Sequence, residues 1–388
     1  MSKNKVLSHY CTGCGLCKSI HEADLSIDRK GFSHPESFQP SILKKICPSY
    51  GKQMKDMSGE IWGRQLKVYY GWSTDQHVRL QASSGGVITA VCLYLLDHGL
   101  VDGIVQVEAD PVTPFETNAV VSYTREGIIK RSGSRYSISS PLEILAQLDR
   151  EKKYCLVGKP CDIDAWKNYI SVNTSESVLF PYLLSFFCMG VPSRDAQIKL
   201  VEHMGCAAEQ CAALRYRGDG WPGKTVAEDR SGHTYSTDYD TSWGTILGRD
   251  LMPACRVCAN GVGETADIAC GDAWYLKDGK PLFTEADGRN VVFARTEKGM
   301  KLLEAVRNAS YLVLQDFNDF ETLLPKMQYA QYERRTTLLS RIIALKLLAK
   351  PAPHYRLRML AGYSRYAPVR SKIRFFKGTL KRALRGIY

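Results

Sequence analysis

The chain has 388 residues, of which 44% are hydrophobic and 24% are charged, and its formal net charge is +12. This length is sufficient for two or three domains with a buried core, and the composition excludes a disordered, collagen-like or low-complexity chain. The charge is concentrated at one end, because residues 334–388 contain 15 lysines and arginines and no aspartate or glutamate. The rest of the chain is slightly acidic, so that an anionic partner would bind mainly to these last 55 residues.

The N-terminal residues lack the apolar segment of a secretory signal, and no stretch reaches the roughly 18 apolar residues of a membrane-spanning helix. We therefore expect a cytoplasmic protein. In that reducing compartment, the 13 cysteines of the chain indicate metal ligation or redox chemistry rather than disulfide bonds.

The first cysteine cluster is a Cys-x2-Cys-x2-Cys run formed by Cys11, Cys14 and Cys17. Three thiolates at this spacing can occupy three corners of a cubane cluster. In two-cluster ferredoxins, a fourth cysteine followed by proline ligates the other cluster, and here Cys47 precedes a proline but has no cysteine run of its own. The pattern predicts one [4Fe–4S] cluster held by these four cysteines; a zinc site or a set of free thiols is the alternative.

A loop of small residues lies between a predicted strand and a predicted helix in the next part of the chain. Residues 67–72 alternate like a strand, residues 87–96 form an apolar helix, and residues 102–108 read as another strand. Between the first strand and the helix lie Ser83, Ser84, Gly85 and Gly86. Such a loop at a helix N-terminus can bind a phosphate or pyrophosphate through free backbone N–H groups, or it can be a simple tight turn.

Strands and helices then alternate, which is typical of an α/β protein and not of a helix bundle or a β-sandwich. We expect helices at residues 141–150, 161–169, 193–204 and 296–308, and extended segments at residues 154–157, 179–187, 213–217, 225–228 and 290–295.

A second set of cysteines follows this pattern. Cys161 comes after one apolar strand, Cys188 ends another, and Cys255 and Cys258 form a Cys-x2-Cys knuckle. These four thiols could form a second site, or Cys161 and Cys188 could be small buried hydrophobic residues. The remaining cysteines are predicted to be core residues: Cys92, Cys155, Cys206, Cys211 and Cys270.

Residues 218–223 match the Gly-x-Gly-x-x-Gly pattern but contain Pro222, and a strand rather than a helix follows them. The dinucleotide fingerprint needs a helix at that point, so that the segment is interpreted as a turn. The sequence contains no Walker A motif, no His-Glu-x-x-His motif and no nucleophile elbow, and hydrolytic chemistry therefore has no support.

From about residue 11 to about residue 328, the chain resembles the beta-subunit family of coenzyme F420-reducing hydrogenases and F420-dependent dehydrogenases. This family also includes chlorophyll-pathway reductases. The matching segments are residues 83–87, 100–104, 133–138, 158–161, 187–190, 255–258, 266–274 and 288–292. The resemblance implies an iron–sulfur flavoprotein that binds FAD and a [4Fe–4S] cluster, to which longer members add an N-terminal ferredoxin-like cluster.

Carried onto this sequence, the resemblance makes Cys161, Cys188, Cys255 and Cys258 the ligands of the core cluster. It also makes the loop from Ser83 through Ser84 and Gly85 to Gly86 the FAD contact. Weaker candidates for FAD contacts are Ser134, Arg135, Tyr136 and Lys159. Because the cofactors would carry the reaction, no side chain is assigned a catalytic role. For Lys159 and Asp272, an exposed salt bridge or a helix cap is expected.

We therefore predict a mixed α/β protein with three parts. These are a ferredoxin-like [4Fe–4S] module at residues 1–60, an FAD and [4Fe–4S] oxidoreductase core with a mixed sheet at residues 61–330, and a helical basic tail at residues 331–388. The implied function couples one-electron transfer through two clusters to two-electron or hydride chemistry at FAD.

The substrate would be coenzyme F420 or a biosynthetic intermediate, such as one in surface-polysaccharide synthesis. Expected redox partners are ferredoxin or a hydrogenase or dehydrogenase subunit. The alternative is a non-catalytic electron-transfer subunit that docks to a larger redox or membrane complex.

In the tail, apolar residues follow helical spacing and basic residues are interleaved with them. The apolar residues are Ile373, Phe376, Leu380, Leu384 and Ile387. This pattern is typical of a helix that lies on an anionic membrane surface, here the inner face of the membrane. The alternatives are a helix packed on the body, a docking arm for an acidic partner, and a nucleic-acid arm, which no recognisable nucleic-acid module supports.

Overall fold

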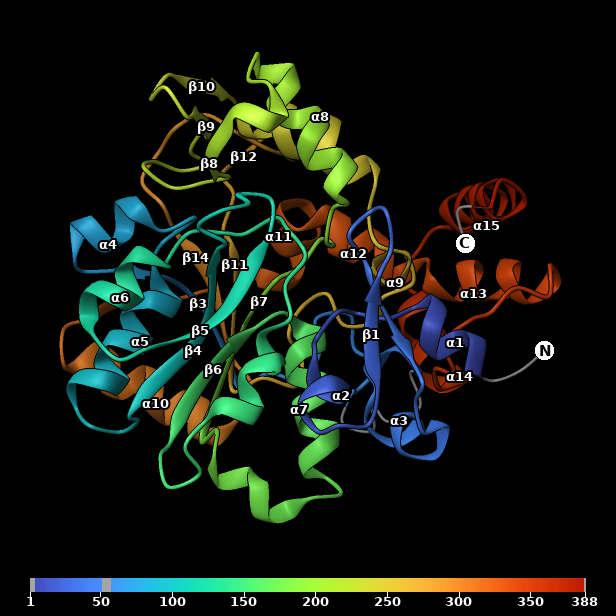
Figure 1. The fold of residues 1–388 in the computed structure, drawn as a ribbon, viewed down its shortest axis with the longest axis horizontal. Coiled ribbons are helices and arrows are strands. Elements are labelled where there is room, and N and C mark those ends of the chain that lie inside the picture. The colour runs from blue at the N-terminus through green and yellow to red at the C-terminus, as the bar shows by residue number, and fades with distance from the viewer. Residues whose placement is uncertain (1–3, 51–56, 387–388) are drawn as a thin grey trace.

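The computed structural model describes residues 4–50 and 57–386. Its centre is a mixed sheet (Figure 1) made of β3 (Lys67–Ser73), β4 (Gly103–Ala109), β5 (Thr117–Ser122), β6 (Tyr154–Gly158), β7 (Tyr182–Phe186), β11 (Ile268–Asp272), β14 (Asn290–Ala294) and β15 (Leu312–Asp316). The order across the sheet is β15-β3-β14-β11-β7-β6-β4-β5. The four strands from β11 to β4 are parallel, and the outer strands on both sides are antiparallel to their neighbours.

The central strands are apolar runs because helices or other segments cover both of their faces. All five residues of β14 are buried, as are four of the five in β11. Their register places Phe293 opposite Val68 on one side and Ala269 on the other. Consecutive residues point to opposite faces, so that Val292 and Phe293 contribute to different apolar cores.

One face of the sheet is covered by α4 (Gln76–Gln81), α5 (Val87–Asp97), α6 (Arg125–Lys130) and α10 (Glu297–Asn308), as Figure 1 shows. Val91 and Leu95 of α5 and Leu303 of α10 are completely buried, and they share a core with Ile104 of β4. Covering the opposite face are η2 (Pro141–Gln147), α7 (Pro160–Ile170) and α11 (Phe320–Met327).

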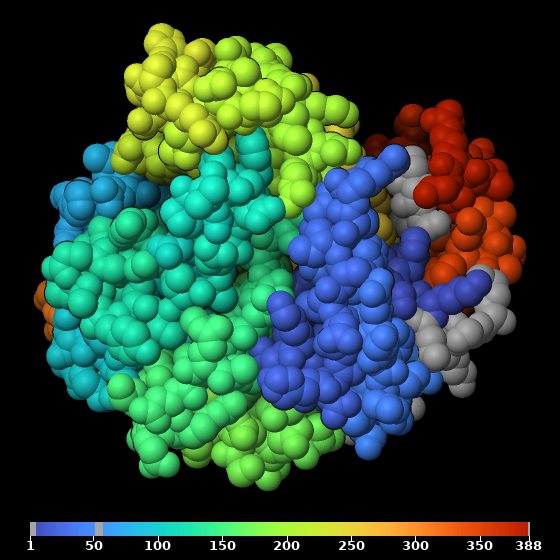
Figure 2. Space-filling model, in the orientation of Figure 1, coloured from blue at the N-terminus to red at the C-terminus, as the bar shows by residue number. Residues whose placement is uncertain are grey.

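The N-terminal segment forms a small module with its own hairpin. Its elements are α1 (Asn4–His9), α2 (Leu16–Ser19), β1 (Asp24–Ile27), β2 (Ser33–Glu36), α3 (Pro40–Ile46) and η1 (Pro48–Tyr50). Leu7 and Leu43 of the module share one apolar core with Leu142 and Trp166 of the body. On the face drawn in Figure 2, this module, in blue, lies between the body and the C-terminal helices. The cysteine-bearing module is therefore packed directly against the rest of the protein.

A second, three-stranded antiparallel sheet lies at the edge of the molecule. It contains β8 (Cys211–Arg215), β9 (Thr225–Asp229) and β10 (Thr234–Thr237), and α8 (Arg194–Met204) packs on it. The other described elements are η3 (Thr174–Val178), η4 (Ala208–Gln210), η5 (Asp240–Ile246), η6 (Leu247–Arg249), α9 (Pro253–Arg256), β12 (Leu276–Lys277) and β13 (Lys280–Pro281).

The C-terminal segment is helical, as predicted. It consists of α12 (Tyr329–Thr336), α13 (Leu338–Leu347), α14 (Leu357–Ser364) and α15 (Val369–Leu384). The Tyr10 hydroxyl donates to the Pro351 carbonyl at 2.9 Å, and the His354 N–H donates to the Tyr50 carbonyl at 2.8 Å. These bonds attach the C-terminal segment to the N-terminal module. Taken together, the helices and the mixed sheet confirm the predicted mixed α/β fold class.

Candidate functional site

A cavity of about 250 Å³ lies at the carboxyl ends of the four parallel strands. It is lined by residues from the ends of β4, β6, β7 and β11, including Val107, Gly158, Phe186 and Asp272. In α/β sheets, ligands bind in this position because the loops that leave the strands surround it.

The predicted Ser–Gly loop forms one wall of this cavity. Gly86 takes a left-handed conformation, with φ of +75°, and it precedes α5 without any side-chain cap. The N-cap residue thus supplies no side-chain acceptor, although the Val87 N–H donates to Asn290 Oδ1 at 3.4 Å, and Gly86, Val87 and Thr89 line the cavity. Such a helix start can bind an anionic group.

The first two residues of the loop from residue 83 are fixed by hydrogen bonds. The Ser84 hydroxyl donates to the Arg289 carbonyl at 2.8 Å, and the Ser83 hydroxyl accepts from the Ser134 N–H at 2.6 Å. A Cβ on Gly85 would lie 2.6 Å from the Gly71 carbonyl oxygen, so that only glycine fits there. The second bond joins two segments that the resemblance linked to FAD.

Two of the weaker candidates for FAD contacts, Tyr136 and Arg135, differ in the groups that they contact. Tyr136 lines the cavity and packs against Trp243, with ring centroids 4.6 Å apart. Arg135 also lines the cavity, but its guanidinium donates to the carbonyls of Leu214, Pro114 and Glu116. The guanidinium thus holds surrounding loops in place.

Lys159 directly follows β6 and is buried, with only 6% of its surface exposed. Its Nζ lies 3.0 Å from Asp162 Oδ2 and donates to the Ser139 hydroxyl at 2.8 Å. Burial lowers the pKa of this ammonium, but the charges of Asp162 and Cys161 outweigh burial and raise the pKa overall. A salt bridge is therefore present, but the expectation that it would be exposed was wrong, because both side chains are buried.

Two buried acceptors on the cavity wall have no hydrogen-bond partner among the described residues. They are Asp162 Oδ1 and Gln106 Oε1. A buried acceptor without a donor is costly. A bound group with N–H or O–H donors would supply partners, and this fits a flavin better than a purely apolar ligand.

An ion pair that the sequence did not reveal closes the far side of the cavity. Arg217 donates two hydrogen bonds of 3.0 Å to the carboxylate of Asp272, and Trp221 Nε1 donates a third at 2.9 Å. The Arg217 guanidinium also lies over the rings of Tyr239 and Trp274. Asp272 was expected in a salt bridge, but Arg217 lies 55 positions away in the sequence and no local pattern indicated it.

The first four cysteines lie within the N-terminal module, near enough for their charges to influence one another. Cys11 and Cys14 lie on the loop before α2, Cys17 is part of α2, and Cys47 follows α3 directly. Burial raises the pKa of each thiol, for Cys17 to about 11, and the charge of Cys47 raises the pKa of the other three further. Gly15 has φ of +82°, which allows the loop to pack against η2.

The second four cysteines line a smaller cavity together. Cys161 is in the first turn of α7, Cys188 follows β7 by two residues, and Cys255 and Cys258 flank the end of α9. Burial raises the pKa of Cys188 to about 11 and of Cys258 to about 12, and the positive charge of Arg334 opposes both shifts. The structure thus brings this predicted set together.

Among the described residues, no group of three or more His, Cys, Asp or Glu side chains converges on the position of a single metal ion. A cubane cluster holds one cysteine at each of four separate corners, so that its ligands do not converge on one point. Two sets of four thiols, one in the N-terminal module and one lining the small cavity, fit such clusters by their donor chemistry.

The two cavities adjoin each other. Lys159, Cys188, Gly190 and Val191 line both of them. The smaller cavity also reaches Thr12, which lies within the first cysteine run, and Pro48, which follows Cys47. The N-terminal cysteines, the core cysteines and the large cavity therefore form one continuous series.

The five other cysteines are buried, as predicted for core residues. Two of them, Cys92 and Cys270, also lie on the apolar wall of the large cavity.

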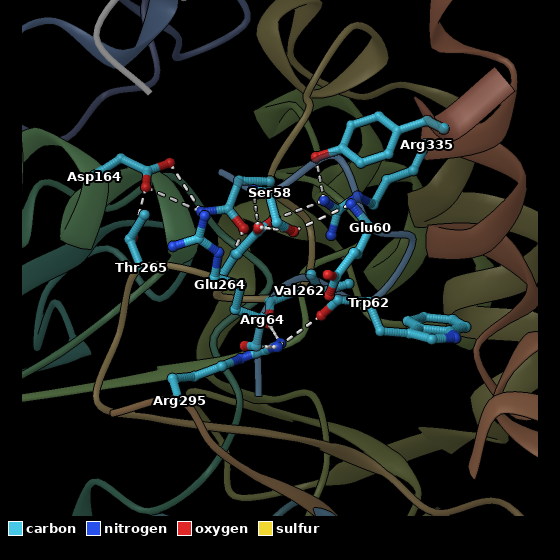
Figure 3. A network of polar contacts seen from close by, with 12 residues as sticks. Ser58, Glu60, Trp62, Arg64, Asp164, Val262, Glu264, Thr265, Arg295 and Arg335 are labelled. Atoms are coloured by element: carbon cyan, nitrogen blue, oxygen red, sulfur yellow. Dashed lines mark hydrogen bonds and ion pairs between the residues drawn. The ribbon is translucent and has the colours of Figure 1, made fainter. Parts of the chain in front are cut away.

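A buried polar network holds the cysteine-bearing segments in place (Figure 3). The Asn260 amide, two residues after Cys258, donates to the carboxylate of Asp164 at 3.0 Å, and Asp164 also accepts from the Thr265 hydroxyl at 2.6 Å. Burial raises the pKa of Asp164 to about 7. Asp164 is part of α7, the helix that carries Cys161, so that this network links two segments of the core set.

The amphipathic tail helix α15 packs on α13 with one side. Thr379 and Ala383 are buried, and Phe375 packs under the guanidinium of Arg341, 4.4 Å from its ring centroid. From the predicted apolar face, Ile373 and Leu384 remain 50% and 75% exposed. Ile387 lies outside the described residues. In the part of the chain that the structure covers, no helix combines the length and the hydropathy needed to cross a bilayer.

The fold is that of an α/β protein whose large cavity lies at the carboxyl ends of parallel strands, the position where such folds bind ligands. Two family models match the chain, and both describe the coenzyme F420 hydrogenase/dehydrogenase beta subunit. The model of its N-terminal part matches residues 68–146, and the model of its C-terminal part matches residues 151–319. The chain belongs to this family.

Relatives with assigned activities are oxidoreductases or their subunits. The coenzyme F420 hydrogenase subunit beta of Methanococcus voltae is 25% identical over 73% of this chain and 95% of the relative. The coenzyme F420-dependent sulfite reductase of Methanocaldococcus jannaschii is 23% identical over 84% of this chain and 51% of the relative. The fold is similar to that of a chain in the F420-reducing [NiFe] hydrogenase complex from Methanosarcina barkeri, with a TM-score of 0.58, 22% identity, and coverage of 75% of this chain and 97% of that one.

Proposed function

We propose that the protein is an iron–sulfur flavoprotein oxidoreductase that couples one-electron carriers to a two-electron substrate. The observation that carries this proposal is the continuous series of two four-cysteine sets and one large cavity, in which Cys188 lines both cavities. Family membership supports a redox role.

In this proposal, one [4Fe–4S] cluster is held by Cys11, Cys14, Cys17 and Cys47, and the other by Cys161, Cys188, Cys255 and Cys258. FAD would occupy the large cavity. When bound, FAD would supply hydride or two-electron exchange, and the clusters would supply one-electron transfer.

The residues of the chain would bind and orient these groups. The first turn of α5 suits the pyrophosphate, because the N-cap Gly86 has no side chain to compete for its N–H groups, although the Val87 N–H donates to Asn290 Oδ1. Asp162 Oδ1 and Gln106 Oε1 are acceptors for the donors of the bound group. Lys159 is held by Asp162 and Ser139 on the wall shared by both cavities, where its positive charge would favour electron-rich states of the bound cofactors.

The substrate is proposed to be coenzyme F420 or a biosynthetic intermediate, such as one in surface-polysaccharide synthesis. The names of the relatives support the first. The second candidate function is a non-catalytic electron-transfer subunit, which the similarity to a chain of a hydrogenase complex favours. Size-exclusion chromatography of the native protein separates the two, since a stable and active monomer or homodimer would argue against the subunit.

We also propose that the C-terminal segment rests on an anionic surface, in the first place the inner face of a membrane. On α15, the exposed Val369, Ile373 and Leu384 lie along one side of the helix, and exposed lysines and arginines flank them. Docking of an acidic redox partner is the alternative occupant of this surface.

Anaerobic purification followed by iron, sulfide and flavin analysis tests the cofactor assignment. The expected result is a coloured protein with about eight irons and one FAD per chain. A colourless, flavin-free protein that contains only zinc would overturn the proposal.

A further inference from the structure

The start of the C-terminal segment reaches the core cysteines. Arg334, on α12, lines the same small cavity as Cys161, Cys188, Cys255 and Cys258. Its guanidinium donates to the carbonyl of Met189, the residue that follows Cys188. The family models end at residue 319, so that Arg334 lies beyond the matched region.

The neighbouring residue explains why Arg334 is held in this position. Arg335 is only 1% exposed, and its guanidinium lies 2.7 Å from Glu264 Oε2 and also donates to the Tyr363 hydroxyl. The same Glu264 accepts from the Ser58 N–H at 2.7 Å (Figure 3). This network fixes α12 against the loop after Cys258.

The charge of Arg334 has no carboxylate to neutralise it. In the described parts of the chain, no Asp or Glu oxygen lies within ion-pair distance of its guanidinium, whereas the preceding Glu333 pairs with Arg374. The thiols of Cys188, Cys255 and Cys258 line the small cavity together with Arg334 and interact with its positive charge, and the carboxylate of Asp164 lines the same cavity beyond ion-pair distance.

We propose that Arg334 is a positioning residue that raises the reduction potential of the core cluster, so that the C-terminal segment is part of the redox site. The inference rests on the proposed function. Reduction adds one electron, and thus one negative charge, to the cluster and its four thiolates, while no bond forms or breaks. A nearby uncompensated cation stabilises the reduced state more than the oxidised state.

The test is an anaerobic redox titration of the full-length protein with its cofactors, with dithionite as the reductant and electron paramagnetic resonance as the readout. The signal that disappears in Cys258→Ser identifies the core cluster. Arg334→Gln should decrease the ratio of reduced to oxidised core cluster about tenfold at a fixed potential, which corresponds to a downward shift of about 59 mV for one electron. Arg334→Lys should retain most of the parent potential.

Arg370→Gln is the matched control, because it removes an equal charge from an exposed position on α15. It should leave the core potential unchanged. An unchanged potential in Arg334→Gln, or an equal shift in the control, would overturn the inference.

If Arg334→Gln loses the core signal while Arg334→Lys keeps it, a positive charge at this position is required for the core cluster to give its signal. That result would support the inference. Loss of the signal from both variants would overturn it, because the side chain would then act through packing. Absence of any cluster signal from the parent protein would instead contradict the proposed function itself.

Discussion

Arg335 and Glu264 form an ion pair in which the guanidinium Nη2 lies 2.7 Å from the carboxylate Oε2, and both side chains are 1% exposed. The pair joins α12 to the loop that follows the Cys-x2-Cys knuckle. Removing one partner of such a pair leaves an uncompensated buried charge. We expect Arg335→Met to lower the free energy of unfolding by about 3–5 kcal/mol, measured by denaturant titration.

The control for this prediction is the ion pair between Arg374 and Glu333, which is largely exposed to solvent. Arg374→Met should cost less than about 1 kcal/mol. Equal losses in the two variants would show that the buried pair has no special role.

Asp164 gives the stability a pH dependence. Its pKa is about 7 in the folded protein and about 3.9 in an unfolded chain, because burial disfavours the carboxylate. Between these values the folded state keeps a proton that the unfolded state has released, so that stability falls as the pH rises from about 4 to about 7. We expect Asp164→Asn to remove about 3 kcal/mol of the fall between pH 5 and pH 8, measured by urea unfolding at both pH values.

An equally large fall in Asp164→Asn and in the parent protein would contradict this assignment. The comparison must be made within each variant, because the substitution can also change stability equally at all pH values.

The two cysteine sets should lose iron independently. Cys14→Ser and Cys258→Ser should each reduce the iron content by about half, from about eight to about four atoms per chain, and the double variant should lose nearly all iron. Cys206→Ala is the control, because Cys206 is a buried core cysteine that lies outside both sets and lines neither cavity. The ligand assignment would be refuted if the iron content of Cys14→Ser were unchanged, or if the control lost as much iron.

Ser83 should affect flavin binding through the loop that it fixes. Its hydroxyl accepts from the Ser134 N–H, and one such bond contributes about 1 kcal/mol. We expect Ser83→Ala to weaken FAD binding about fivefold in a fluorescence titration of protein whose flavin has been removed. Ser177→Ala removes an exposed hydroxyl that is not among those lining the cavity and should have no effect. Equal weakening in both variants, or in neither, would count against this role of the loop.

The surface of α15 should bind anionic vesicles. Substitution of Lys377 and Lys381 by Glu should weaken binding to vesicles that contain phosphatidylserine by at least about tenfold, because each basic residue contributes about 1 kcal/mol near such a surface. The same exchange at the exposed body residues Lys152 and Lys153 is the matched control. Equal binding of the tail variant and the parent protein would leave an acidic protein partner as the occupant.

Local sequence patterns predicted much of this fold. The apolar run at residues 87–96 corresponds to α5, and the short apolar segment at residues 154–157 corresponds to β6. These elements are governed by periodicity and by the glycines that precede or follow them. Strands β5 and β15 were not predicted, because they are half-exposed edge strands with a weak apolar pattern.

The relationships between distant residues could not be predicted in the same way. Neither the ion pair between Arg217 and Asp272 nor the position of Arg334 beside the core cysteines follows from spacing in the sequence. In the tail, the spacing predicted an amphipathic helix correctly, but the buried side is centred on Thr379 and Ala383 because α13 packs there. The packing of α13 therefore determines which face of α15 is buried, and the hydrophobic pattern alone did not indicate that face.

The central claim is that the N-terminal cysteine set, the core set and the large cavity form one route for electrons. The most direct test is anaerobic stopped-flow reduction of the bound flavin by reduced ferredoxin in the full-length parent protein and in Cys14→Ser. We expect Cys14→Ser to keep its flavin and its core cluster but to lose most of the ferredoxin-driven reduction rate. A flavin reduced at the parent rate in that variant would contradict the route.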